Sequence, residues 1–190
     1  MRITVFCGSS RRSRDPYVAA ARTLGGEIAR RGHTLVYGGA KIGLMGAVAD
    51  AALAAGGSVR GVILRDFVDR GDVHHPGVEM QSVDDMRARK AGLDGGGDAF
   101  VTLAGGLGTL EEFTEILSFR QLGFHHRPVV LLNTAGFFDP LLAQIERAIA
   151  DGFVRPEHRA LCAVTADPAH AVDLCEQGTT EAGSTDSKFA

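Results

Sequence analysis

The chain has 190 residues, of which 45% are hydrophobic and 23% charged, and its formal net charge is −3. This length suits one domain that can bury a core without disulfides or a metal. The small negative charge excludes a general attraction for nucleic acid or an anionic membrane. The odd number of cysteines, Cys7, Cys162 and Cys175, favours neither a disulfide framework nor a structural zinc site.

The apolar runs are short. None approaches the about 18 residues of a membrane span, and residues 3–7 are too few for the core of a secretory signal. We therefore expect no membrane partner and a cytoplasmic location.

Strand-like runs and helical periodicities alternate along the chain. Residues 129–132, for example, are apolar throughout, as a strand buried on both faces requires. This alternation predicts an α/β fold with a parallel sheet and helices on both faces. The expected strands are residues 3–6, 34–37, 59–64, 80–82, 99–103, 129–132 and 163–166, and the expected helices are residues 16–31, 43–55, 83–92, 109–122, 138–150 and 169–176. We assign residues 1–177 to one domain and expect the Gly-, Ser- and Thr-rich residues 178–190 to be disordered.

Three loops rich in glycine or serine follow predicted strands, at residues 7–11, 38–46 and 104–109. Ligands of open α/β sheets bind at the carboxyl ends of the strands, so we expect the three loops to share one pocket. Gly105, Gly106 and Gly108 let the main chain approach an anion, and the next helix directs unpaired amides at it. This pattern predicts a phosphate site.

Two common phosphate motifs do not fit the glycine loop. A P-loop requires a lysine after its last glycine, where Thr109 stands, and a dinucleotide fingerprint requires a third glycine where Glu111 stands. Thr109 and Glu112 have the spacing of a capping box, in which each side chain bonds the backbone of the other residue. On spacing alone, this structural role is favoured over a catalytic one. Alternatively, the Glu112 carboxylate faces the sugar of a nucleotide and takes part in chemistry.

The basic run at residues 87–90 is interpreted first as a solvated helix face. Arg87 and Arg89 point roughly 200° apart on a helix, so at most part of the run enters a pocket. The histidine pairs at residues 74–75 and 125–126 lack metal-ligand spacing and are interpreted as loop residues. Ser9 and Ser10 have no placed base for a nucleophilic role.

Together these residues resemble the LOG ("lonely guy") family of cytokinin-activating phosphoribohydrolases, which are often mislabelled as lysine decarboxylases. The family signature Pro-Gly-Gly-x-Gly-Thr-x-x-Glu matches residues 104–112, except that Ala104 replaces the proline. Further landmarks, in family order over residues 2–176, are residues 6–10, 37–39, 43–46, 86, 89–90 and 121–123.

The resemblance implies a Rossmann-like, doubly wound homodimer that cleaves the N-glycosidic bond of a nucleoside 5′-monophosphate without metal or cofactor. It implies Arg89 and Glu112 as the catalytic pair. The implied substrate- and phosphate-binding residues are Gly8, Ser9, Gly39, Gly43, Met86, Lys90, Gly105, Gly106, Gly108 and Thr109.

The chemistry of these residues fits such a reaction. A carboxylate such as Glu112 can stabilise an oxocarbenium-like sugar and orient water, while Arg89 either grips an oxygen of the substrate or holds Glu112 ionised. Departures from the family pattern at Lys41, Ala104 and His126 leave the base open. The alternative function is a nucleotide-binding or sensing module without turnover.

Overall fold

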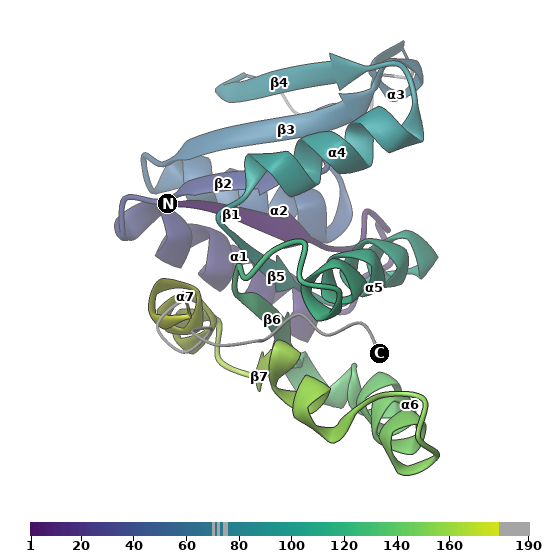
Figure 1. The fold of residues 1–190 in the computed structure, drawn as a ribbon. Coiled ribbons are helices and arrows are strands. Elements are labelled where there is room, and N and C mark those ends of the chain that lie inside the picture. The colour runs from purple at the N-terminus through teal and green to yellow at the C-terminus, as the bar shows by residue number, and fades with distance from the viewer. Residues whose placement is uncertain (70, 72, 74–75, 179–190) are drawn as a thin grey trace.

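The computed structural model describes residues 1–69, 71, 73 and 76–178. All described strands form one parallel sheet of order β4-β3-β2-β1-β5-β6-β7 (Figure 1). The strands are β1 (Arg2–Phe6), β2 (Thr34–Tyr37), β3 (Ser58–Leu64), β4 (Val78–Val83), β5 (Ala99–Thr102), β6 (Val129–Leu132) and β7 (Ala163–Thr165).

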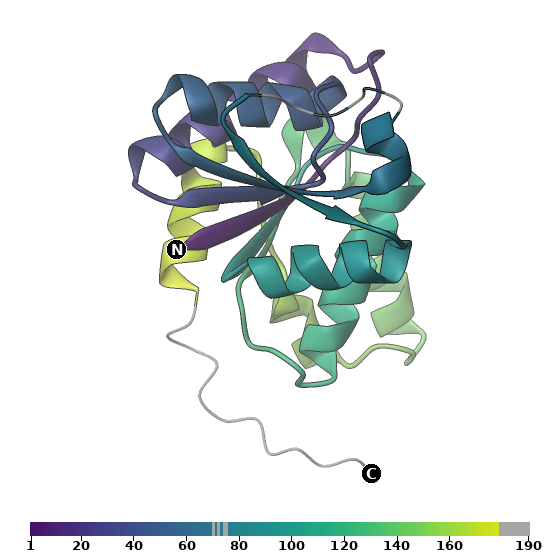
Figure 2. The ribbon, with the colours of Figure 1, turned by 90° about the horizontal axis from the view of Figure 1, so that it is seen from above.

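Helices cover both faces of this sheet (Figure 2). Between the strands lie α1 (Asp15–Arg30), α2 (Gly43–Ala54), α3 (Arg65–Asp69), α4 (Met86–Gly96), α5 (Leu107–Gln121), η1 (Thr134–Gly136), α6 (Asp139–Ala150) and η2 (Pro156–Leu161), and α7 (Pro168–Gln177) follows β7. The predicted doubly wound α/β architecture is confirmed.

The core is divided by the sheet because neighbouring side chains of a strand point to opposite faces. Val5 belongs to the cluster that packs with α1, α2 and α7, including Leu24 and Val48. Phe6, the next residue, belongs to the cluster on the other face, which includes Leu93 of α4 and Phe113 of α5. Two independent apolar layers therefore hold the sheet.

The strand order reverses between β1 and β5, which pair with Val5 opposite Val101 and Phe6 opposite Thr102. Strands β2, β3 and β4 follow one another outward on one side of β1, and the chain then returns to add β5 on the other side. Loops that leave the carboxyl ends of these two strands separate there and open a crevice. This point positions the candidate site.

Several boundaries differ from the sequence prediction. The edge strand β4 covers Val78–Val83 rather than residues 80–82 because it pairs with β3 along that whole length. Helix α4 begins at Met86 rather than at residue 83, after the N-cap Asp85, whose carboxylate accepts a hydrogen bond from the Ala88 amide at 2.8 Å. The short elements α3, η1 and η2 were not predicted, since they lack the length to show a periodicity.

Two sequence expectations fall mostly or wholly outside the described residues. Of the predicted disordered tail, only Gly178 is described, where it caps α7. His74 and His75 are not described. Among the described helices, none is long and apolar enough to cross a membrane.

Candidate active site

The three predicted loops meet at the switch point between β1 and β5. The Gly8 amide, after β1, donates a hydrogen bond to the Ala104 carbonyl, after β5, at 3.0 Å. A Cβ on Gly8 would lie 3.2 Å from the Gly105 Cα, so the two loops touch through their backbones. The Leu44 amide, after β2, donates to the Gly8 carbonyl at 2.9 Å. The three loops are thus in contact, while the pocket that they are expected to share stays a prediction.

The loop after β2 approaches the loop after β1 at Gly43. This residue has a φ of +60°, and a Cβ there would lie 2.5 Å from the carbonyl carbon of Ser9. The first amides of α2 are therefore directed at protein: Leu44 and Met45 both donate to the Gly8 carbonyl, at 2.9 and 3.3 Å. The N-terminus of α2 is therefore closed by the loop after β1 and does not offer its first amides to a ligand.

Helix α5 begins at Leu107 after the N-cap Gly106, and no side chain caps it. A Cβ on Gly106 or Gly108 would meet no heavy atom within 4 Å, whereas a Cβ on Gly105 would lie 2.1 Å from the Thr109 hydroxyl. Thr109 itself is buried. Gly105 thus fits tightly beneath the turn and the other two glycines face open space, where uncapped amides and the helix dipole favour an anion.

The capping-box interpretation is wrong. Thr109 is the third residue of α5 rather than its N-cap, because the helix begins at Leu107. The Glu112 carboxylate is not available for a cap, since it accepts a hydrogen bond from Arg89 Nη1 at 2.8 Å.

Arg89 of α4 and Glu112 of α5 form a buried ion pair, and each residue is 7% exposed. The guanidinium fits because residue 38 is a glycine: a Cβ there would lie 2.4 Å from Arg89 Nη2. The Gly38 carbonyl accepts a second, longer hydrogen bond from that nitrogen at 3.5 Å. The interpretation of the basic run as a solvated face is therefore wrong for Arg89, although Arg87 is exposed.

The surroundings of the Glu112 carboxyl shift its pKa in opposite directions. Burial raises its pKa, the Arg89 guanidinium lowers it, and the neighbouring carboxylates Glu111 and Glu115 raise it again. Burial dominates, so the net pKa lies above the ordinary value of 4.5. Cys7 also lies close to this pair, and burial raises the pKa of its thiol, which stays neutral. The site thus holds a carboxylate that is more basic than usual.

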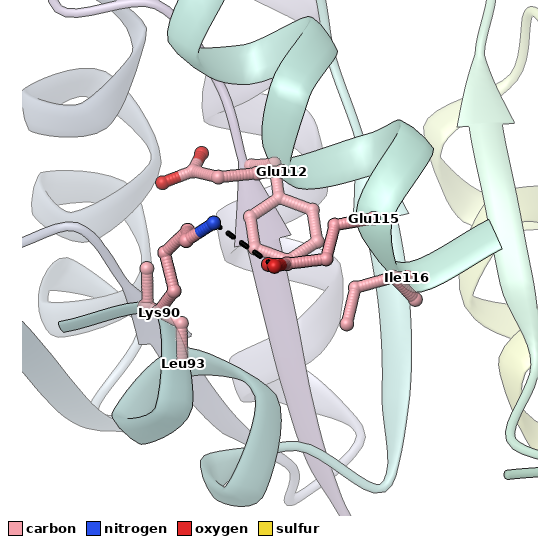
Figure 3. Close-up of a pocket in the computed structure, with 6 residues that line it drawn as sticks. Lys90, Leu93, Glu112, Glu115 and Ile116 are labelled. Carbon is pink, nitrogen blue, oxygen red and sulfur yellow. Dashed lines mark hydrogen bonds and ion pairs between the residues drawn. The ribbon is translucent and has the colours of Figure 1, made fainter. Parts of the chain in front are cut away.

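The remaining predicted residues differ in their exposure and in their contacts. Lys90 points to α5, where its ammonium pairs with Glu111 at 2.6 Å and with Glu115 at 2.9 Å. Figure 3 shows Lys90, Glu112 and Glu115 lining one small pocket. Met86 at the start of α4 is 49% exposed, and Ser9 is exposed. Gly39 is buried with a φ of +82°.

The described histidine pair has a structural explanation. His125 is buried, its Nε2 lies 3.0 Å from the Ile116 carbonyl, and its ring lies against Phe100. His126 is exposed. Within the described ranges, no three His, Cys, Asp or Glu side chains gather as metal ligands would.

A comparison with known proteins places the chain in a family. A family model described as "Possible lysine decarboxylase" matches residues 45–175. A cytokinin riboside 5′-monophosphate phosphoribohydrolase of Rhodococcoides fascians is 44% identical over 171 residues, which make up 90% of this chain and 86% of that protein. The chain belongs to the LOG family. The cytokinin riboside 5′-monophosphate phosphoribohydrolase LOG5 of Arabidopsis thaliana is 45% identical over 158 residues, or 83% of this chain and 69% of that protein.

Solved structures of proteins with other names share the fold of this LOG-family chain. The molybdenum cofactor carrier protein of Chlamydomonas reinhardtii matches with a TM-score of 0.69 at 23% identity, covering 93% of this chain and 96% of that one. The molybdenum cofactor binding protein of Rippkaea orientalis matches equally well, at 0.69 and 23%, over 93% and 95%. At this identity the likeness concerns the fold.

Sequence reasoning missed two features of the site. Gly38 is predicted only as part of the glycine loop at residues 38–46, yet its missing side chain makes room for Arg89. The two adjacent glycines after β2 are the only signal in the sequence for such a close approach. The pairing of Lys90 with Glu111 and Glu115 was also missed, because it joins helices that are distant in the sequence.

Proposed function

We propose that this chain hydrolyses the N-glycosidic bond of a nucleoside 5′-monophosphate, releasing the free base and ribose 5-phosphate. The observation that carries the proposal is the buried Arg89–Glu112 pair, which lies just inside the first turns of an uncapped helix. The names of the relatives, at 44% and 45% identity, support the same reaction.

The phosphate is assigned to the N-terminus of α5. Gly106 and Gly108 leave the amides of this turn accessible, and Gly105, packed against Thr109, lets the loop approach the helix closely. In this assignment Gly8, Ser9, Gly39, Gly43 and Met86 border the rest of the nucleotide. Binding energy from the phosphate, which does not react, would hold the glycosidic bond against Glu112.

The reaction needs one carboxylate and one water. The bond between C1′ and the base nitrogen breaks, and its electron pair leaves with the base, which takes up a proton from solvent. The cationic sugar that develops is stabilised by the negative charge of Glu112. The water oxygen bonds to C1′ and gives up a proton, which a carboxylate of raised pKa accepts more readily than an ordinary one. Glu112 later returns to solvent the proton that it accepts from the attacking water. Arg89 holds that carboxylate in place.

The base is proposed from the relatives alone. Cytokinin riboside 5′-monophosphates are the first substrates to test, because two relatives carry that activity in their names. Ala104, where the family signature has proline, is buried, and its carbonyl accepts the Gly8 hydrogen bond. Lys41 is exposed on the loop after β2, where an added cation changes the surroundings of the substrate.

We also propose that the chain forms a homodimer in which α5 takes part. Three large apolar residues at the ends of this helix are exposed: Leu107 by 86%, Leu122 by 50% and Phe124 by 73%. Burial of such residues in an interface is favourable. Light scattering should give a mass near twice 20.0 kDa, and a monomer at working concentration would contradict the proposal.

The cytoplasmic location stays a prediction.

The experiment is a product assay. Purified protein is incubated with isopentenyladenosine 5′-monophosphate, AMP, GMP, CMP and UMP, and the free base and ribose 5-phosphate are quantified by mass spectrometry. We expect equimolar base and ribose 5-phosphate from at least one monophosphate, and far slower release from its nucleoside. Binding of a monophosphate without release of base from any of them would contradict hydrolysis and indicate a sensing module.

A further inference from the structure

The residue that follows Arg89 in α4 forms the second link to α5. The Lys90 ammonium lies 2.6 Å from a carboxylate oxygen of Glu111 and 2.9 Å from one of Glu115. Figure 3 shows Lys90 and Glu115 joined across the pocket that Glu112 also lines. The Lys90 and Glu115 side chains are 22% and 29% exposed, so water screens this pair incompletely, whereas Glu111 is 51% exposed and more strongly screened.

Without Lys90, α5 would place three carboxylates close together. Glu111 directly precedes Glu112 in the chain. Glu115 follows Glu112 by three residues, and this spacing makes Glu112 and Glu115 neighbours on the helix surface. Both neighbours disfavour the ionised form of Glu112 and raise its pKa. Like charges at this spacing repel. A charge from another element is needed to balance them.

The groups recorded around Glu112 divide into two sets. From α4, Arg89 pairs with Glu112 itself, and Lys90 pairs with Glu111 and Glu115. From the end of β1, the Cys7 thiol approaches but stays neutral, because burial raises its pKa. Lys90 therefore compensates the two carboxylates that Arg89 does not reach.

We propose that Lys90 is a positioning residue whose charge neutralises Glu111 and Glu115, so that Glu112 stays ionised beside Arg89 at the pH of turnover. This differs from a direct contact between Lys90 and the substrate phosphate, because the two carboxylates of α5 occupy the ammonium. The consequence for turnover rests on the proposed function, whereas the ionisation of Glu112 does not.

The test replaces Lys90 by methionine, which keeps the length of the side chain and removes the charge. The titration midpoint of Glu112 is followed by NMR of its side-chain carboxyl carbon, assigned by difference with Glu112→Gln. We expect the midpoint to rise by about half to one pH unit, as loss of a nearby charge at intermediate dielectric predicts. The acid limb of kcat/KM should move by the same amount. Lys90→Arg should leave both unchanged.

A second set of variants separates charge balance from a mechanical link between the helices. In Lys90→Met/Glu111→Gln/Glu115→Gln the link is still absent, but the repulsion is gone, so the Glu112 midpoint should return to the wild-type value or below it. Glu111→Gln/Glu115→Gln with Lys90 intact should lower the midpoint, which confirms that the two carboxylates act on Glu112. If Lys90→Met does not fold, Lys90→Gln takes its place, with the same rise of the midpoint expected.

Two outcomes overturn the proposal: an unchanged Glu112 midpoint in Lys90→Met, or a triple variant whose midpoint stays as high as that of the single variant. The failure of the proposed function looks different. If the wild-type protein releases no base from any monophosphate, the pH profile is lost, but the NMR titration still decides the role of Lys90.

Discussion

The two helix layers are held together in different ways. On one face, α1 and α2 pack backbone to backbone, since a Cβ on Gly25 would lie 2.1 Å from the Val48 carbonyl oxygen. On the other face, α4 and α5 are linked by ion pairs, Arg89 with Glu112 and Lys90 with Glu111 and Glu115. Apolar packing removes no charge from water, whereas a buried ion pair carries a desolvation penalty that can exceed its attraction. The α4–α5 layer therefore carries charges that stability does not require and that chemistry can use.

The largest expected effect is on the charged layer. Glu112→Gln keeps the shape of the side chain and removes its charge, so turnover should fall by roughly 100-fold or more, with nucleotide binding retained. Single-turnover kinetics and calorimetry measure the two quantities. Glu146→Gln, at an exposed pair on α6, is the control and should leave turnover unchanged. Turnover of Glu112→Gln within tenfold of wild type would show that this carboxylate is not catalytic.

The apolar layer should respond in stability instead. Gly25→Ala introduces a Cβ against the α2 backbone and should lower the free energy of unfolding by about 1–3 kcal/mol. Gly26→Ala is the matched control, because its Cβ would meet nothing within 4 Å and alanine favours the helix by about 0.5–1 kcal/mol. Urea denaturation measures both variants. Equal stability of Gly25→Ala and Gly26→Ala would show that close backbone contact does not hold α1 against α2.

The pH dependence should reveal the raised pKa of Glu112. If the ionised carboxylate is required, the acid limb of kcat/KM has its midpoint above 4.5, the ordinary value for this group. The effect on folding has the opposite sign. A carboxyl whose pKa is higher in the folded state stabilises the fold most below 4.5 and loses this contribution as the pH rises through the folded-state pKa. A pH–activity profile with a midpoint at or below 4.5 would contradict the first expectation.

The smallest effect is expected at Arg87. It lies two residues from Arg89 but is exposed on α4, so Arg87→Gln should leave kcat/KM within about twofold of wild type, as exposed surface changes usually do. Arg89→Gln should instead lose activity, because the variant removes the ion pair that holds the buried Glu112 carboxylate. Equal losses of activity in the two variants would show that the basic run acts through its overall positive charge and that Arg89 has no role of its own.

Much of the fold could be predicted because its signals are local. The alternation of strands and helices, the fully apolar strand at residues 129–132 and the glycine loops after strands indicate a parallel sheet before any contact is known. The family resemblance of residues 104–112 is confirmed as well. Short elements such as α3 lie below the length at which a periodicity shows.

The site was less predictable because its decisive contacts join distant segments. The spacing of Thr109 and Glu112 fits a capping box, and only the earlier start of α5 and the position of Arg89 show that the carboxylate turns inward. The basic run has the composition of a solvated surface. Its one buried member, Arg89, depends on the space left by Gly38, which is 51 residues away in the sequence.

The most direct test is a crystal structure of Glu112→Gln with a nucleoside 5′-monophosphate bound. We expect the phosphate at the first turn of α5, within hydrogen-bond distance of its uncapped amides, and the anomeric carbon beside the side chain of residue 112. A phosphate bound elsewhere, or an anomeric carbon out of reach of residue 112, would contradict the assignment of this crevice as the active site.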